Sequence, residues 1–169
     1  MLAPSDISLG ILAGGRATRL GGRDKAWIER GGSAQVVRLA HRFAGECGKV
    51  LVSANRELPR YAVLALHAVP DRQPDLGPLG GLDALAAACA TPWLLTLPVD
   101  LGEAADGLPR RLAQAGGQGA VARDDDGLQP LVALYRVEAL RAALAAALAD
   151  GEYSVRALQA SLALPVVTF

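Results

Sequence analysis

Continuous hydrophobic stretches alternate along the chain with segments whose apolar residues recur at helical spacing. The apolar run Trp93–Val99 is typical of a central strand that is covered on both faces. The spacing of apolar residues in 34–47 is instead typical of an amphipathic helix. The pattern predicts strands over residues 7–12, 49–54, 67–70, 93–99, 120–123 and 129–136, helices over 34–47, 80–90, 108–115, 137–149 and 152–162, and an extended segment over 165–169.

This alternation predicts an α/β protein with a mostly parallel sheet and right-handed crossovers. Ligands of such sheets bind beyond the carboxyl ends of the strands. A glycine-rich loop follows the first predicted strand, and Asn55, Asp71 and Asp100 follow the second, the third and the 93–99 strand. We therefore expect four separate segments to meet at one edge of the sheet.

The loop after the first strand combines glycines with cations: Gly14, Gly15, Gly21, Gly22, Arg16, Arg19, Arg23 and Lys25. Glycine lets backbone N–H groups approach an anion closely, and Arg19 and Lys25 add full positive charge. Together they suit a polyphosphate. The loop is neither a P-loop, because Lys25 follows Asp24 rather than glycine, nor a GxGxxG dinucleotide motif. The alternative is a solvated connector rich in Gly and Arg.

Asp100 and Asp71 are the candidate acidic groups of the site. A carboxylate beside a phosphate loop can hold Mg²⁺, while the alternative role for Asp100 is to cap a helix starting near Glu103. Asp71 could accept hydrogen bonds from a base or ribose, or simply begin a turn. The segment 77–81, GPLGG, which ends at Gly81, needs close backbone approach to either a helix or a ligand. The run Asp124–Asp126 is interpreted as a solvated turn.

Composition narrows the class of protein. One domain is expected for 169 residues, and the 17 basic residues balance the 17 acidic ones, so neither a nucleic-acid nor a membrane surface is indicated. Cys47 and Cys89 are far apart and without a CxxC partner, which argues against a zinc or iron–sulfur site. The first residues lack the pattern of a secretory signal, so a cytoplasmic protein is expected.

The glycine-rich loop also carries a resemblance. LAGGRATRLGGRDKA (12–26) resembles the signature LAGGxSxRMGxDK of the molybdenum cofactor guanylyltransferases. Further segments resemble that family in the same order: VLVSANRE (50–57), PDRQPDLGPLGGLDAL (70–85), LLTLPVDLG (94–102) and QPLVALYRVEALRAALAAAL (129–148). The resemblance implies a Rossmann-like three-layer fold with helices on both faces. It also implies a single nucleotidyltransferase domain over 1–169, with a nucleotide-binding N-terminal half and a C-terminal half on the acceptor side.

The reaction that the resemblance implies is transfer of GMP from GTP to the phosphate of molybdopterin, with Mg²⁺ and with release of pyrophosphate. Transient contact with proteins that deliver the cofactor is also implied. Arg19 and Lys25 would bind the phosphates, and Asp100 would hold the metal, so these three residues are the catalytic candidates. The nucleotide-binding candidates are Leu12, Ala13, Gly14, Gly15, Lys25, Ser53, Asn55, Asp71, Gly81 and Asp100.

The chain departs from the family pattern at three places. Ser53 stands where the family often has Asn, so Asn55 is an alternative for contact with the base. Leu101 and Gly102 follow Asp100 where the family usually has a proline two residues on. The closing Asn-x-Asn-Thr-Pro segment is missing, so either the sequence is truncated after Phe169 or its acceptor side is incomplete. A cytidylyltransferase and a non-catalytic nucleotide-binding module therefore remain as alternatives, although Gly15 favours guanylyl transfer by resemblance.

Overall fold

A single seven-stranded sheet forms the centre of the structure, a computed structural model that describes residues 1–14, 19–20 and 23–169, with residues 19, 20 and 23 described by their backbone alone. The strand order is β11-β9-β10-β8-β1-β6-β7. The strands are β1 (Ile7–Leu12), β6 (Lys49–Ser53), β7 (His67–Val69), β8 (Trp93–Pro98), β9 (Gly119–Asp124), β10 (Gly127–Arg136) and β11 (Val166–Thr168).

The sheet is mostly parallel, as the sequence pattern predicts. β1 pairs in parallel with both β6 and β8, β6 pairs in parallel with β7, and β11 pairs in parallel with β9. β10 is antiparallel to both of its neighbours, β8 and β9. The adjacent strands β8, β1, β6 and β7 therefore all run in one direction, and their carboxyl ends share one edge.

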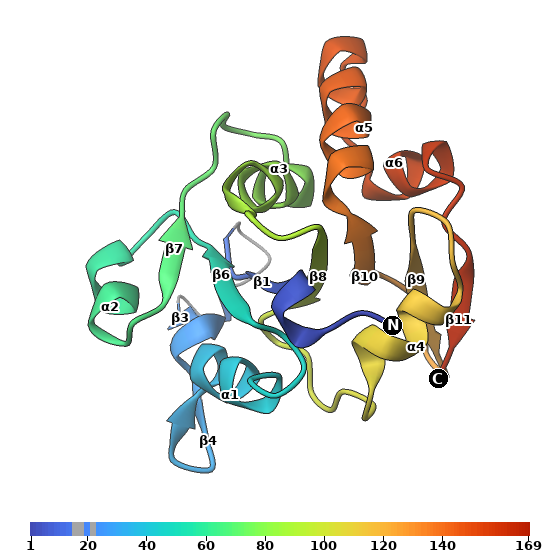
Figure 1. The fold of residues 1–169 in the computed structure, drawn as a ribbon. Helices are drawn as coiled ribbons and strands as arrows, with labels where there is room; N and C mark the ends of the chain where they lie inside the picture. The colour runs from blue at the N-terminus through green and yellow to red at the C-terminus, as the bar shows by residue number, and fades with distance from the viewer. Residues whose placement is uncertain (15–18, 21–22) are drawn as a thin grey trace.

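Helices cover both faces, which gives three layers (Figure 1). The helices are α1 (Gln35–Arg42), α2 (Leu58–Val63), α3 (Pro78–Ala88), α4 (Leu108–Gln114), α5 (Val137–Asp150) and α6 (Val155–Ser161). One hydrophobic cluster packs α1, α4 and the Tyr61 side chain of α2 against the sheet. The other packs α3, α5 and α6 against the opposite face. The expected α/β class and the helices on both faces are confirmed.

The first strand shows how the sequence builds these layers. All six residues of β1 are buried, and Ile7, Leu9 and Ile11 belong to the cluster beneath α1 and α4. Gly10 points to the other face, where a Cβ atom would lie 2.9 Å from Cδ1 of Leu85 in α3. The missing side chain therefore lets α3 pack closely on the centre of the sheet.

Several boundaries differ from those predicted. α1 ends at Arg42 rather than at residue 47, because Phe43 begins a series of turns that includes Gly45. α6 starts at Val155, where the Ser154 side chain accepts a hydrogen bond from the Ala157 N–H and caps the helix. The elements that the pattern misses are all short: the 3₁₀ turns Pro4–Asp6 (η1) and Lys25–Trp27 (η3), helix α2, and the strand pairs β2 (Arg19–Leu20) with β3 (Arg23–Asp24) and β4 (Glu29–Arg30) with β5 (Ser33–Ala34).

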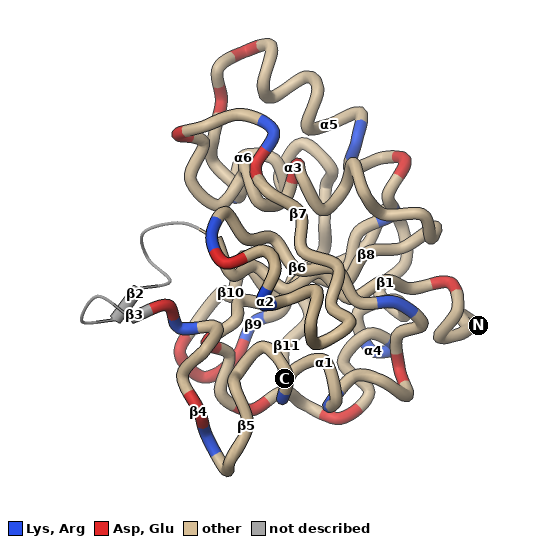
Figure 2. The backbone as a smooth tube through the Cα atoms, turned by 90° about the vertical axis from the view of Figure 1, so that its left-hand side faces the viewer, with Lys and Arg blue, Asp and Glu red and all other residues tan. Residues whose placement is uncertain are grey.

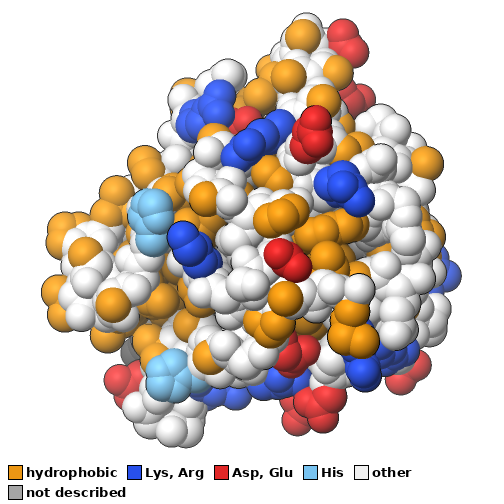
Figure 3. Space-filling model, in the orientation of Figure 1, with side chains coloured by type: hydrophobic (Ala, Val, Ile, Leu, Met, Phe, Trp, Pro, Cys, Tyr) orange, Lys and Arg blue, Asp and Glu red, His pale blue; other side chains and the backbone are white. Residues whose placement is uncertain are grey.

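Charged residues are spread over the molecule. Lys and Arg are interspersed with Asp and Glu around the backbone trace in Figure 2. On the face shown in Figure 3, basic and acidic side chains form small separate groups, with apolar side chains between them. Within the described ranges, each helix is too short or too polar to cross a bilayer.

The start of β9 generates a stability prediction. Gly119 has φ +128, and a Cβ atom there would overlap the carbonyl oxygen of Leu134 in β10. Gly119→Ala should therefore lower the free energy of unfolding by about 2–3 kcal/mol, through backbone strain and overpacking. The measurement is urea denaturation followed by circular dichroism.

Gly116→Ala is the matched control, because Gly116 also has a positive φ (+79) but open space around its Cβ position. Gly116→Ala should lower the free energy of unfolding by only about 1 kcal/mol, which is the cost of a left-handed conformation alone. Equal losses for the two variants would contradict the assigned pairing of β9 with β10.

Candidate functional site

A cavity of about 1010 Å³ lies at the carboxyl edge of β8, β1, β6 and β7. Eight residues that the sequence nominates line it: Leu12, Gly14, Lys25, Ser53, Asn55, Asp71, Gly81 and Asp100. The same wall contains Pro74, Asp75, Leu76, Gly77, Pro78, Pro98 and Leu131. The loops that follow four neighbouring parallel strands thus enclose one space.

Lys25 and Asp100 meet at the rim of this cavity. The Nζ atom of Lys25 donates a hydrogen bond to Oδ2 of Asp100 at 2.9 Å, although the two residues are 75 positions apart in sequence. Lys25 begins the η3 turn, which Asp24 caps by accepting a hydrogen bond from the Ala26 N–H at 3.0 Å. The two side chains are 22% and 45% exposed, so this pair contributes little to stability and a charged ligand can separate it.

Asp100 does not cap a helix. Residues 101–105 form no regular element, and the next helix, α4, starts at Leu108 after Gly107. The proposal that Asp100 caps a helix near Glu103 is therefore wrong. The carboxylate is instead presented to the cavity by the turn that ends β8, where the Leu101 N–H bonds to the Pro98 carbonyl.

Ser53 is the last residue of β6 and Asn55 lies two residues further on, and their side chains differ in their hydrogen bonds. Ser53 is 1% exposed, and its Oγ atom has no hydrogen-bond partner among the described residues. Asn55 accepts a hydrogen bond through Oδ1 from the backbone N–H of Asp71 at 2.8 Å. Asn55 therefore ties the end of β6 to the loop after β7, while Ser53 offers a free hydroxyl at the floor of the cavity.

Asp71 and the GPLGG segment pack against each other. A Cβ atom at Gly80 would lie 2.9 Å from Oδ2 of Asp71, and one at Gly81 would lie 2.6 Å from Oγ of Ser53. The two glycines thus let the first turn of α3 approach the side chains of the site. Oδ1 of Asp71 is buried and, within the described part of the chain, unpartnered. An unpaired buried acceptor of this kind favours a ligand that donates hydrogen bonds.

Of the other three nominated residues, only Ala13 is fully described. Ala13 is 2% exposed and lies in the core beneath α1, with its N–H bonded to the Ser53 carbonyl. Gly15 lies outside the described residues. Arg19 is described only by its backbone, as the first residue of β2, which pairs with β3.

Pro74, Asp75, Leu76, Pro98 and Leu131 are lining residues that sequence reasoning did not nominate, while Gly77 and Pro78 belong to the GPLGG segment noted above. The segment 74–78 sits within the Pro- and Gly-rich stretch before α3, where Asp75 and Gly77 have φ values of +61 and +59. That density of turn residues is a signal that could have pointed to it. Leu131 reaches the cavity from β10, where the pairing with β9 shifts register between Gln129 and Ala133. No feature of the sequence indicates that shift.

Burial alters the chemistry of several groups outside the cavity. Burial, with a smaller contribution from Glu46, raises the pKa of the Cys47 thiol to about 12. Burial also raises the pKa of Tyr61 and of Tyr135. None of these three residues lines the cavity. Cys47 is therefore a protonated core residue at neutral pH and not a nucleophile.

Asp100 fits a metal that arrives together with a polyphosphate. Among the residues that the structure describes, no three His, Cys, Asp or Glu side chains gather into a potential metal cage. Mg²⁺ commonly binds one or two carboxylates and completes its coordination with substrate phosphates and water. A single carboxylate beside a lysine at the rim is consistent with that donor set.

Comparison with known proteins gives one family. The family model for the MobA-like NTP transferase domain matches residues 9–165. The chain is 37% identical to a molybdenum cofactor guanylyltransferase of Cupriavidus necator, over all of this chain and 89% of that protein. It is 35% identical to a molybdenum cofactor guanylyltransferase of Vibrio cholerae, over 91% of this chain and 77% of that protein.

Solved structures share the fold at lower sequence identity. The molybdopterin-guanine dinucleotide biosynthesis protein A of Archaeoglobus fulgidus aligns with a TM-score of 0.68 and 17% identity, over 96% of this chain and 82% of that chain. The 2-C-methyl-D-erythritol 4-phosphate cytidylyltransferase of Thermus thermophilus aligns with a TM-score of 0.66 and 17% identity, over 95% and 86%. Because proteins named for different nucleotides align equally well, the fold alone does not select the base.

Proposed function

Because the chain belongs to the family of MobA-like NTP transferase domains, we propose that it transfers GMP from GTP to the phosphate of molybdopterin and releases pyrophosphate. The chain is a nucleotidyltransferase, and what is proposed here is how its residues divide the work. The contact between Lys25 and Asp100 at the rim of the cavity carries the proposal, because it places a cation and a carboxylate where a triphosphate and its metal would both be held.

The polar groups at the floor of the cavity favour guanine as the bound base. Guanine presents an N1–H and an amino group side by side, and the unpartnered carboxylate oxygen of Asp71 can accept from such donors. Cytosine instead has hydrogen-bond acceptors next to its amino group, and a carboxylate would repel these acceptors. The Ser53 hydroxyl can donate or accept at the same floor, and Leu12 supplies an apolar surface for the ring.

At the rim, Lys25 exchanges the carboxylate of Asp100 for oxygens of the triphosphate. By their resemblance to the family signature, Arg19, Gly14 and Gly15 are also proposed to bind the nucleotide. Asp100 would then hold a divalent metal, which we propose to be Mg²⁺. The bound metal would supply neutralisation of the charge on the phosphates. A phosphate oxygen of molybdopterin attacks the α-phosphorus in line, a new P–O bond forms, and the bond to pyrophosphate breaks. This transfer needs positioning and charge stabilisation rather than a nucleophilic side chain.

The acceptor is proposed to bind on the side of the C-terminal half. Leu131 of β10 brings that half to the wall of the cavity that also holds Asp100. Molybdopterin bound on this side would contact a different element from those that hold the base, and it would approach the α-phosphorus from there.

Thermal shift tests the choice of nucleotide. GTP with Mg²⁺ should raise the melting temperature more than CTP or ATP under the same conditions, because a ligand at 100 times its dissociation constant stabilises the native state by about 2.7 kcal/mol. Asp71→Asn should shrink the difference between GTP and CTP, since a neutral amide has one acceptor oxygen where a carboxylate has two. Release of pyrophosphate on addition of molybdopterin then separates an enzyme from a binding module.

An equal response to all three nucleotides would contradict guanine recognition. Stabilisation by GTP without pyrophosphate release in the presence of molybdopterin would favour the non-catalytic alternative. A larger shift with CTP would favour a cytidylyltransferase.

The two lysines of the chain provide a matched pair for the phosphate site. Lys25→Ala should lower the turnover number about 100-fold or more, because a group that stabilises developing charge has effects of that size. Lys49→Ala removes an exposed lysine at the amino end of β6, at the opposite edge of the sheet, and should leave turnover close to that of the unmodified chain. The measurement is pyrophosphate release at saturating GTP, and retention of more than about a tenth of the activity in Lys25→Ala would contradict the role of Lys25.

The metal role of Asp100 can be tested by titration. Asp100→Asn should raise the Mg²⁺ concentration needed for half-maximal activity about tenfold or more, because a neutral amide is a poorer ligand than a carboxylate. Asp125→Asn, in the exposed turn between β9 and β10, is the control and should titrate like the unmodified chain. An unchanged Mg²⁺ titration in Asp100→Asn would mean that this residue holds no metal.

A further inference from the structure

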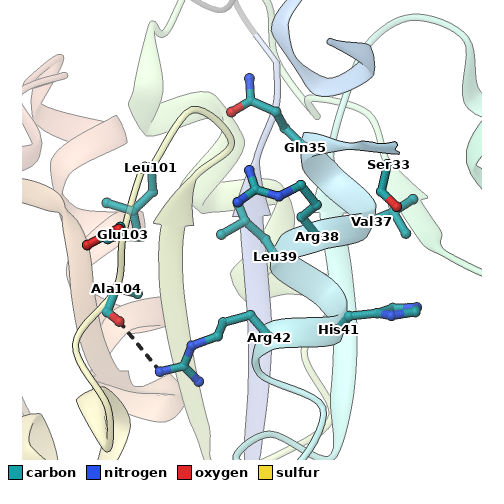
Figure 4. A pocket seen from close by; sticks show the side chains of 11 residues that line it. Ser33, Gln35, Val37, Arg38, Leu39, His41, Arg42, Leu101, Glu103 and Ala104 are labelled. Carbon is teal, nitrogen blue, oxygen red and sulfur yellow. Dashed lines mark hydrogen bonds between the residues drawn. The ribbon is translucent and has the colours of Figure 1, made fainter. Parts of the chain in front are cut away.

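Helix α1 packs against the η3 turn, which carries Lys25, and faces the segment that follows Asp100. A cleft of about 440 Å³ separates α1 from residues 101–104, the segment directly after Asp100 (Figure 4). Arg38, Leu39 and Arg42 face this cleft from the helix, and Leu101, Glu103 and Ala104 lie on the opposite side (Figure 4). Gln35 stands at the first turn of the helix, at the end of the cleft nearest the η3 turn.

Gln35 connects α1 to the backbone of Lys25. Its Nε2 atom donates a hydrogen bond to the carbonyl oxygen of Lys25 at 3.1 Å. The Ile28 N–H also bonds to this carbonyl, at the longer distance of 3.4 Å, and the Gln35 N–H bonds in turn to the Ile28 carbonyl at 3.0 Å. The η3 turn is therefore held to the start of α1 through both the side chain and the backbone of one residue.

The burial of Gln35 is not accounted for by packing alone. The residue is 3% exposed and shares the inward face of α1 with Val36, Leu39 and Ala40. Its Oε1 atom is buried with no hydrogen-bond partner in the described residues. A buried amide that makes one of its four possible hydrogen bonds is unfavourable compared with an apolar side chain of the same size. Among the described residues, the bond to the Lys25 carbonyl is the gain that a glutamine side chain brings at this position.

The other end of α1 is fixed to the segment that follows Asp100. Arg42 donates a hydrogen bond to Oδ1 of Asp106 at 2.7 Å and to the Ala104 carbonyl at 3.5 Å, and it also pairs with Glu46 at 2.9 Å. A rigid helix thus bonds near Lys25 at its first turn and downstream of Asp100 at its last turn. Because the helix is attached at both ends, its first turn is a firm point from which to hold Lys25.

We propose that Gln35 is a positioning residue for Lys25. Gln35 is not among the described residues that line the cavity of about 1010 Å³, and it fixes the backbone from which the Lys25 ammonium reaches the rim of the site. This inference rests on the proposed function, in which Lys25 stabilises the charge on the phosphates. Removing the amide should loosen the η3 turn and spread the ammonium over several positions, while the remainder of the cavity stays intact.

Gln35→Met tests this role, because methionine keeps the size of the side chain and removes the amide donor. The turnover number should fall about tenfold or more, since small misplacements of a catalytic group are costly, while the KM for GTP should change much less. Ser8→Ala is the matched control. It removes a part-buried hydrogen bond between the hydroxyls of Ser8 and Thr91, 2.7 Å apart, at the amino edge of the sheet, and should leave both constants unchanged.

Tryptophan fluorescence reads the position of the turn without depending on catalysis. Trp27 ends η3 and packs on Tyr61, with ring centroids 4.6 Å apart, and beneath Arg60. The sequence has two tryptophans, so Trp93→Phe leaves Trp27 as the single reporter. In that background Gln35→Met should increase quenching of Trp27 by acrylamide, and Ser8→Ala should not.

The two measurements separate the inference from the function on which it rests. Increased quenching together with a lower turnover number supports positioning by Gln35. Unchanged quenching, or a turnover number within about twofold of the parent, overturns it, since a positioning role requires a larger loss. If the parent chain releases no pyrophosphate, the proposed function fails, and the fluorescence result still decides whether Gln35 holds the turn.

Discussion

The shared direction of four neighbouring strands is the constraint on which the site depends. β8, β1, β6 and β7 are hydrogen-bonded side by side in parallel, so each must end at the same edge. Parallel strands require a crossover between them, and each crossover begins with a loop at that edge. Four loops from distant parts of the sequence are thereby brought around one cavity without any direct link between them in the chain.

Close packing of α3 closes this cavity from one side and limits what its floor can hold. Gly10 admits the side of α3 to the centre of the sheet, and Gly80 and Gly81 admit its first turn to Asp71 and Ser53. With no side chains in the way, a carboxylate oxygen of Asp71 and the hydroxyl of Ser53 are buried next to the first turn of α3. The small residues that allow this packing therefore also set the polarity that a base would meet.

The sequence predicts elements well where a single pattern is long or strongly apolar. The limits of β1, β8 and α5 lie within a residue of their predicted bounds, because burial on both faces or a long Ala- and Leu-rich run leaves little choice. The reversal of β10 was not predicted, since an apolar run such as QPLVALYR carries no information on strand direction. Helix α2 is not predicted from the sequence, because six residues are fewer than two turns and show no reliable period.

The residues of the candidate site also divide into those that a sequence pattern can locate and those that it cannot. Asp71 and Asp100 could be nominated because their place after a strand fixes the edge at which they lie. Gln35 and Leu131 could not, because their roles depend on which way a side chain faces after the helix or strand has packed. Asn55 and Ser53 show that even a correct location leaves the role open: both lie at the carboxyl end of β6, yet Oδ1 of Asn55 accepts a hydrogen bond from the Asp71 N–H, while the Ser53 hydroxyl has no partner among the described residues. Ser53, the shorter side chain, keeps its hydroxyl unpartnered within the described residues, and it lies in space that the absent side chain of Gly81 leaves open, since a Cβ atom there would lie 2.6 Å from its Oγ atom.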